Sequence, residues 1–145
     1  MDTSLIGQKS TPKSITVEQG QAQFFAKATG AKDKVYRDVE AAKAAGHPAL
    51  PIAPTFLFCL DSLAPSTDQG ILQKLGVDIG RLLHGEQRFR YGKPVYAGDV
   101  ITFQNEVTDM YEKKGGALKF VVSETTATNQ HGEHVGTMIN SLVIR

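Results

Sequence analysis

The sequence predicts an α+β fold in which an antiparallel sheet wraps around one central helix. Helix signals dominate up to about residue 80 and strand signals dominate after it. One helical segment, residues 54–64, is apolar on nearly all sides, as a helix enclosed by a sheet must be. A length of 145 residues favours one domain, and we expect it to span residues 1–145.

The composition argues against several classes of protein. Hydrophobic residues make up 41% of the chain and charged residues 21%, which is typical of a folded globular protein. The net charge of +1 gives no reason to expect a nucleic-acid partner. The longest apolar stretch, residues 50–60, contains two prolines and is too short to cross a bilayer, and the N-terminus lacks a secretion signal. We therefore expect no membrane partner and a cytoplasmic location.

The sequence predicts no metal site and no cofactor. The single cysteine, Cys59, is expected to be a small buried residue, because it has no partner for an internal disulfide. His131 and His134 flank Glu133, but this stretch contains a glycine and is typical of a hairpin turn. Two histidines so close in sequence bind one metal ion when both lie on the same face of a helix, which a hairpin turn does not provide.

Two short helices are predicted in the first third of the chain. Thr16, with a glutamine three positions later, is typical of a capping box and predicts a helix over about 17–28. Asp38 precedes an alanine-rich run that stops at Gly46, which predicts a helix over about 39–45.

The central helix is predicted over 54–64. Pro54 suits the first turn of a helix, and apolar residues follow at helical spacing. Residues 65–81 mix turn formers with one short apolar run, which indicates a long connection that carries a helical turn.

Four strands are predicted from Leu82 onward. Their separators, residues 92–99, 113–116 and 129–133, are rich in the glycine, asparagine and aspartate that turns require. Consecutive strands joined in this way form an antiparallel meander.

Alternation of apolar residues predicts which face of the sheet is buried. The residues expected on that face are Ile101, Phe103 and Val107 in one strand and Leu118, Phe120 and Val122 in the next. The helix over 54–64 is the element apolar enough to pack on this face.

Three stretches of the chain resemble the MaoC-like hydratases and dehydratases, which have the hot-dog fold. These stretches are ATGAKDKVYRDVEAAKAAGH at 28–47, IAPTFLFCL at 52–60 and HGEQRFRYGKPVYAGDVI at 84–101. Together they cover the family's hydratase segment, the start of its central helix and its strand–Pro–Gly–Asp–strand passage.

The resemblance implies that the family's catalytic pair is missing. Active members use an aspartate and a histidine of the hydratase segment to add water to an enoyl thioester. Gly30 and Asp38 match that segment, but Ala31 stands at the aspartate position and Tyr36 at the histidine position. The chain is therefore similar to the non-catalytic subunit of heterodimeric (3R)-hydroxyacyl dehydratases. We expect it to be a subunit of a hydro-lyase that pairs with a catalytic MaoC-type chain.

The resemblance also implies a set of substrate-binding residues. In the family, a backbone N–H at the start of the central helix holds the thioester oxygen. The residues implied for binding an acyl-CoA or acyl-carrier thioester are Tyr36, Ala53, Pro54, Thr55 and Phe56.

Two other functions stay open from the sequence. His84, with Asp33 or another acidic residue, is a candidate for a rearranged catalytic site in a homo-oligomeric hydratase. The other is a protein that binds acyl thioesters and catalyses no reaction. Under each of the three hypotheses we expect the chain to form a dimer or larger assembly with another copy of itself or with a partner, because a lone sheet leaves an exposed edge.

Overall fold

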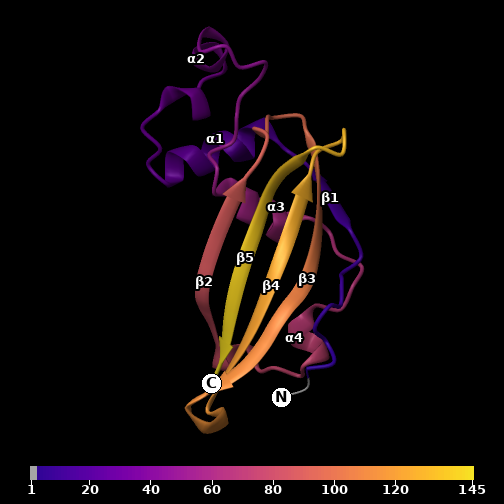
Figure 1. The fold of residues 1–145 in the computed structure, drawn as a ribbon. Helices are drawn as coiled ribbons and strands as arrows, with labels where there is room; N and C mark the ends of the chain where they lie inside the picture. Colours follow the sequence, from indigo (N-terminus) through magenta and orange to yellow (C-terminus); the bar gives the residue numbers. More distant parts are fainter. Residues whose placement is uncertain (1–2) are drawn as a thin grey trace.

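The computed structural model describes residues 3–145 and contains a single five-stranded antiparallel sheet (Figure 1). The strand order is β1-β3-β4-β5-β2. The strands are β1 (Lys13–Thr16), β2 (Leu82–Tyr91), β3 (Val100–Lys113), β4 (Leu118–Thr128) and β5 (His134–Ile144).

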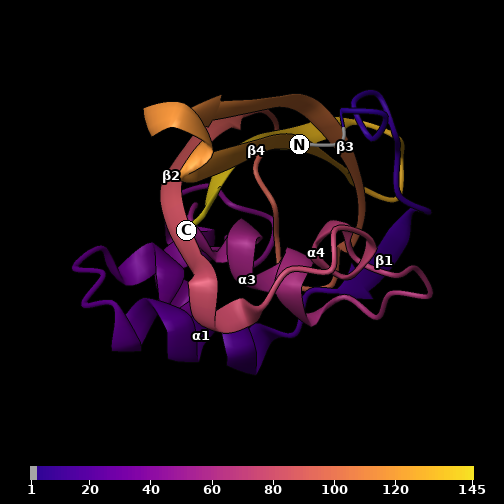
Figure 2. The same cartoon turned by 90° about the horizontal axis from the view of Figure 1, so that it is seen from below.

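The sheet arches over helix α3, and helix α1 lies on the opposite side of α3 (Figure 2). The rings of Phe25 in α1 and Phe56 in α3 lie 4.9 Å apart, so α1 covers the face of α3 that the sheet leaves open. The α-helices are α1 (Gln19–Ala28), α2 (Val39–Ala44), α3 (Phe56–Leu63) and α4 (Ile71–Lys74), and three 3-10 turns are η1 (Lys34–Tyr36), η2 (Ile79–Arg81) and η3 (Lys114–Gly116). The predicted α+β arrangement around a central helix is confirmed.

The cap predicted for α2 is present and the one predicted for α1 is not. Asp38 accepts hydrogen bonds from the backbone N–H groups of Glu40 and Ala41 at 2.8 and 3.2 Å. Thr16 does not cap α1, because it is the last residue of β1, and Glu18 precedes the helix without a side-chain cap. Pairing of Thr16 with Val100 commits this segment to the sheet.

The predicted meander is wrong at one strand. β3, β4 and β5 follow one another, but β2 pairs with β5 and not with β3. The chain from Tyr91 to Val100 therefore crosses from one edge of the sheet to the region next to β1. A fifth strand, β1, was also not predicted, since its four residues are too few to give a clear alternation.

The buried face of β4 differs from the one that the alternation predicts. Val121, Ser123, Thr125 and Ala127 face the core, so Leu118, Phe120 and Val122 lie on the opposite face. On that outer face Phe120 stacks on Tyr111 at 4.7 Å between ring centroids. The inner face of β4 thus carries two hydroxyl side chains, Ser123 and Thr125, whereas the alternation predicts apolar residues on this face.

The core around α3 is packed closely enough to require glycine on β5. Leu57 and Leu60 of α3 are buried against the sheet. A Cβ atom at Gly136 would lie 2.5 Å from Cδ2 of Leu57, which is closer than any real contact. The missing side chain at Gly136 is what lets the helix approach the sheet.

We expect Gly136→Ala to lower the free energy of unfolding by about 1 to 3 kcal/mol, because Leu57 must leave its position. Urea denaturation measures this. Gly20→Ala is the matched control, since nothing lies within 4 Å of a Cβ atom there and α1 gains a better helix former. Equal stability of the two variants would contradict the close approach.

Within residues 3–145, no helix is long and apolar enough to span a membrane.

Candidate functional site

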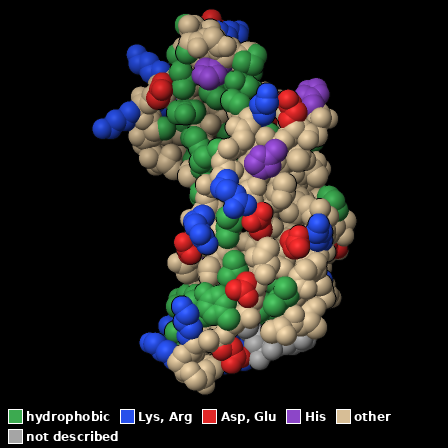
Figure 3. Space-filling model, viewed as in Figure 1, with side chains coloured by type: hydrophobic (Ala, Val, Ile, Leu, Met, Phe, Trp, Pro, Cys, Tyr) green, Lys and Arg blue, Asp and Glu red, His purple; other side chains and the backbone are tan. Residues whose placement is uncertain are grey.

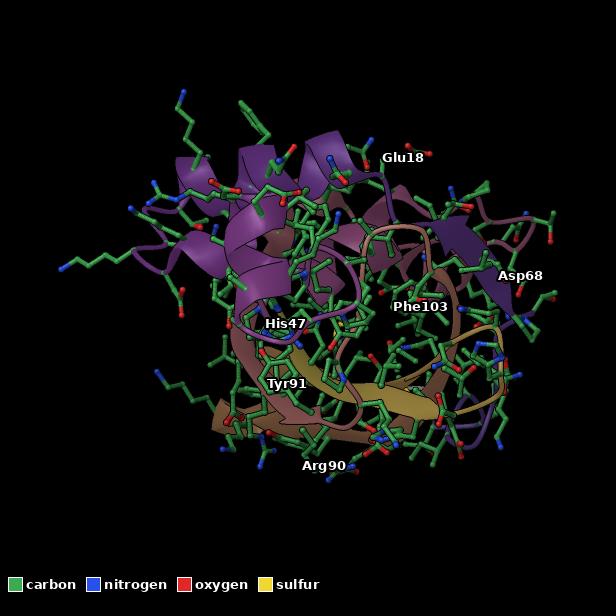
Figure 4. All side chains as sticks on the ribbon, turned by 90° about the horizontal axis from the view of Figure 1, so that it is seen from above. Glu18, His47, Asp68, Arg90, Tyr91 and Phe103 are labelled. Atoms are coloured by element: carbon green, nitrogen blue, oxygen red, sulfur yellow. The ribbon has the colours of Figure 1, made fainter. Side chains whose placement is uncertain are left out.

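A cavity of about 280 Å³ lies at the start of α3, between the end of β2 and the lobe that contains η1 and α2, residues 34–47. Tyr36 and His47 line it from the lobe, Pro54 and Leu57 from α3 and the turn before it, and Tyr91 from β2. Figure 4 looks onto this end of the molecule and shows His47 and Tyr91 side by side. Figure 3 shows that hydrophobic side chains surround a histidine on this lobe, with Lys and Arg side chains projecting beside them.

The polar groups of this cavity are phenols, one imidazole and one ammonium group. His47 Nδ1 lies 3.2 Å from the Tyr96 hydroxyl, which holds the imidazole in place. Lys93 Nζ faces Glu133 at 3.8 Å. The lining side chains include no carboxylate. The cavity can therefore bind and orient a ligand, but it lacks the acid group that usually orients a catalytic imidazole.

Two groups near this cavity have shifted pKa values. Partial burial raises the pKa of the Tyr91 phenol, so this group is a neutral hydrogen-bond donor at physiological pH. A hydrogen bond from Asn129 and the charge of Lys93 lower the pKa of Glu133. Glu133 is exposed and lies in the turn between β4 and β5, where its carboxylate accepts a hydrogen bond from Asn129 and so stabilises the turn.

The backbone at the start of α3 offers a hydrogen-bond donor. Phe56 N–H donates to the Ala53 carbonyl at 2.8 Å and Phe58 N–H donates to the Thr55 carbonyl at 3.1 Å. Pro54 has no N–H. Among the residues that the structure describes, no acceptor lies in hydrogen-bond geometry to the Thr55 N–H. This N–H is one of the free donors that every helix start presents.

Two of the five residues predicted to bind the substrate line this cavity. Tyr36 and Pro54 line the cavity, and Ala53, Thr55 and Phe56 form the helix start beside it. Ala53 and Phe56 are buried and do not line the cavity.

Asp33 and His84 lie outside this cavity. Asp33 accepts a hydrogen bond from Val35 N–H at 3.1 Å and caps η1. The ring of His84 stacks on that of Phe58 at 5.8 Å between centroids. His84 and Tyr91 are seven residues apart on β2, which corresponds to about 20 Å along a strand. The structure therefore places His84 far from the cavity that holds Tyr36.

His47, Tyr91 and Tyr96 belong to the site although the sequence did not indicate them. His47 follows Gly46, which comes shortly after the end of α2. Its contact with Tyr96 joins positions that are 49 residues apart. Nothing local in the sequence marks such a contact. In the described part of the chain, no group of three or more His, Cys, Asp or Glu side chains could hold a metal ion.

Comparisons with known proteins give the family. The family model for the FAS1-like dehydratase domain region matches residues 4–138. A UPF0336 protein of Streptomyces coelicolor is 35% identical over 149 positions, which cover 100% of this chain and 95% of that protein. A UPF0336 protein of Leifsonia xyli is 41% identical over 131 positions, which cover 89% and 85% of the two chains.

Solved structures give the fold. The HadBC complex of Mycobacterium tuberculosis, a (3R)-hydroxyacyl-ACP dehydratase, matches with a TM-score of 0.80 and 27% identity over 99% of both chains. The ChsH1-ChsH2 complex of the same organism matches with a TM-score of 0.75 and 19% identity over 94% of this chain and 88% of that one. The (R)-hydratase of A. caviae matches with a TM-score of 0.70 and 20% identity over 99% and 100%. The chain therefore belongs to the UPF0336 proteins of the FAS1-like dehydratase family and has the hot-dog fold of the MaoC-like hydratases.

Proposed function

We propose that this chain is the non-catalytic hot-dog subunit of a (3R)-specific enoyl-thioester hydratase or 3-hydroxyacyl-thioester dehydratase. The observation that carries the proposal is the lining of the cavity at α3, which keeps Tyr36 and a helix start but has no carboxylate. Adding water to an enoyl thioester needs a base for the proton of water and an acid for the α-carbon. A cavity without such a pair supports binding and positioning of the substrate.

His47 is the one imidazole that lines the cavity in the described part of the chain. Its Nδ1 shares a hydrogen bond with the Tyr96 hydroxyl, and only Nε2 is left for a ligand. One neutral imidazole can accept a proton at that atom, but it cannot also protonate the α-carbon in the same step. His47 therefore fits the role of a hydrogen-bonding residue for the bound thioester.

The substrate that this cavity suits is an acyl thioester on coenzyme A or on an acyl carrier. The free N–H of Thr55, at the positive end of α3, can donate to the thioester oxygen. The apolar walls formed by Ile52, Leu57 and Val135 suit the hydrocarbon next to it.

The partner of this chain is expected to bind along β2. This strand pairs with β5 on one side and forms an edge of the sheet. A ten-residue edge strand exposes backbone groups that favour pairing with another chain. HadBC and ChsH1-ChsH2, which share the fold, are complexes, and this supports a second hot-dog chain as the partner.

The experiment is enoyl-CoA hydration, followed by the loss of absorbance of the conjugated thioester. Three samples are compared: this chain alone, a MaoC-type catalytic chain alone, and the two co-expressed. We expect no turnover by this chain alone, and a changed rate or chain-length preference for the co-expressed pair relative to the catalytic chain.

Two results would contradict the proposal. Robust turnover by this chain alone would favour a homo-oligomeric hydratase, and His84→Ala and His47→Ala would then show which imidazole acts. Saturable acyl-CoA binding with no effect on any catalytic chain would favour a binding protein without chemistry.

A further inference from the structure

The cavity at the start of α3 has a polar mouth and an apolar deep end. The lining side chains that are exposed mark the mouth, and they include Tyr91 and Lys93. Four lining side chains are aliphatic and at most 6% exposed, and these form the deep end: Ile52, Leu57, Val95 and Val135. A bound ligand therefore places its polar end at the mouth and its apolar end among aliphatic groups.

The packed core closes the deep end of this cavity. Leu57 lies so close to β5 that a Cβ atom at Gly136 would be 2.5 Å from its Cδ2. Leu60 and Phe103 are fully buried in the same apolar cluster. A second cavity, of about 240 Å³, is bordered by Asp61 further along α3 and shares no lining residue with the first. The cavity at the start of α3 is therefore a closed pocket, which limits the length of the chain that it can hold.

The volume of the pocket sets that length. Each non-hydrogen atom of an organic ligand takes about as much space as a water molecule in the liquid, roughly 30 Å³. The pocket of about 280 Å³ therefore holds roughly nine such atoms. Two of them are the oxygen and the sulfur of the thioester, which leaves room for about seven carbons.

We propose that this pocket binds short acyl thioesters, with acyl chains of no more than about seven carbons, an inference that rests on the proposed function. Each methylene that enters the deep end leaves water and gains contact with aliphatic groups, which favours binding. A longer chain must leave its end in water or displace side chains of the packed core, which is unfavourable. Affinity therefore rises with chain length only until the pocket is full.

The experiment measures the binding of saturated acyl-pantetheine ligands to the purified chain by calorimetry, for acyl chains of even length from two to twelve carbons. Saturated chains are used because they cannot be hydrated. We expect the affinity to rise about fourfold with each added methylene up to about six carbons. From eight carbons onward, we expect no further gain.

Val135→Ala and Val95→Ala each remove two methyl groups from the deep end, and an apolar cavity of this kind readily takes up an apolar ligand. Each variant is expected to extend the gain by about two carbons. Val121→Ala is the matched control, because Val121 is 1% exposed but belongs to the second apolar cluster and does not line the pocket. It should keep the wild-type limit. Circular dichroism checks the folding of each variant.

Three results would overturn the proposal: a wild-type affinity that keeps rising through twelve carbons, no measurable binding at any length, or an unchanged limit in both folded pocket variants. If neither variant folds, the wild-type series alone decides. The measurement needs no catalytic partner, so this proposal and the proposed function can fail separately. A length limit found in a chain that has no effect on hydration by a co-expressed catalytic chain would contradict the proposed function alone.

Discussion

The double substitution Ala31→Asp and Tyr36→His is expected to give the chain alone a hydration rate at least about 100-fold above that of the wild-type chain. These are the positions where the resemblance places the family's acid–base pair. Tyr36 lines the cavity beside the start of α3, so a histidine there would face the same bound thioester. The resemblance implies an aspartate at position 31 as the second group, so the double variant carries both groups of the pair.

The rate is measured by the loss of enoyl-CoA absorbance, with circular dichroism as the check on folding. Each single substitution is the control, because neither supplies a complete acid–base pair. We expect both single variants to stay near the wild-type level. A double variant that is folded, binds acyl-CoA and shows no gain would contradict the placement of the catalytic positions at Ala31 and Tyr36.

Leu60→Ala is expected to lower the free energy of unfolding by about 2 to 5 kcal/mol. Leu60 is fully buried in α3, in the cluster that joins the helix to the sheet. For a domain of this length, such a loss corresponds to a fall in melting temperature of roughly 5 to 15 °C. The helix has eight residues, and most of its stability comes from this packing.

Leu63→Ala is the matched control, since Leu63 lies one turn further along α3 and is 53% exposed. Its loss is expected to change stability by less than about 1 kcal/mol. Calorimetric melting of the two variants measures the difference. Equal melting temperatures would mean that α3 is not the centre of the core.

The helices could be predicted from the sequence to within about two residues. α2 begins after Asp38 and α3 lies within 54–64, as the cap and the apolar spacing indicate. These signals act between residues that are close along the chain, so a local pattern carries them. The same holds for the turns that separate β3, β4 and β5.

The pairing of the strands could not be predicted in the same way. Nothing in residues 82–91 indicates that this strand joins β5 and not β3. That choice depends on contacts between segments far apart in the sequence. The inner face of β4 was also predicted wrongly, because alternation assigns apolar residues to the core, while Ser123 and Thr125 occupy it here.

Some residues of the candidate site could likewise be predicted from the sequence and others could not. The resemblance pointed to Tyr36 and to the start of α3, and the structure brings Tyr36 and Pro54 into one cavity. It did not point to His47, whose place is set by a contact with Tyr96. It also did not indicate that Asn140 and Gln87 are neighbours, because they meet only when β5 and β2 pair.

Composition, caps and apolar spacing were sufficient to predict one α+β domain with an apolar helix at its centre. These signals describe interactions between residues that are close along the chain, so they can be recognised from the order of residues alone. The tertiary structure alone decided the strand order and the separation of His84 from the cavity. These features arise when distant segments pack together, since burial and strand pairing depend on the whole chain.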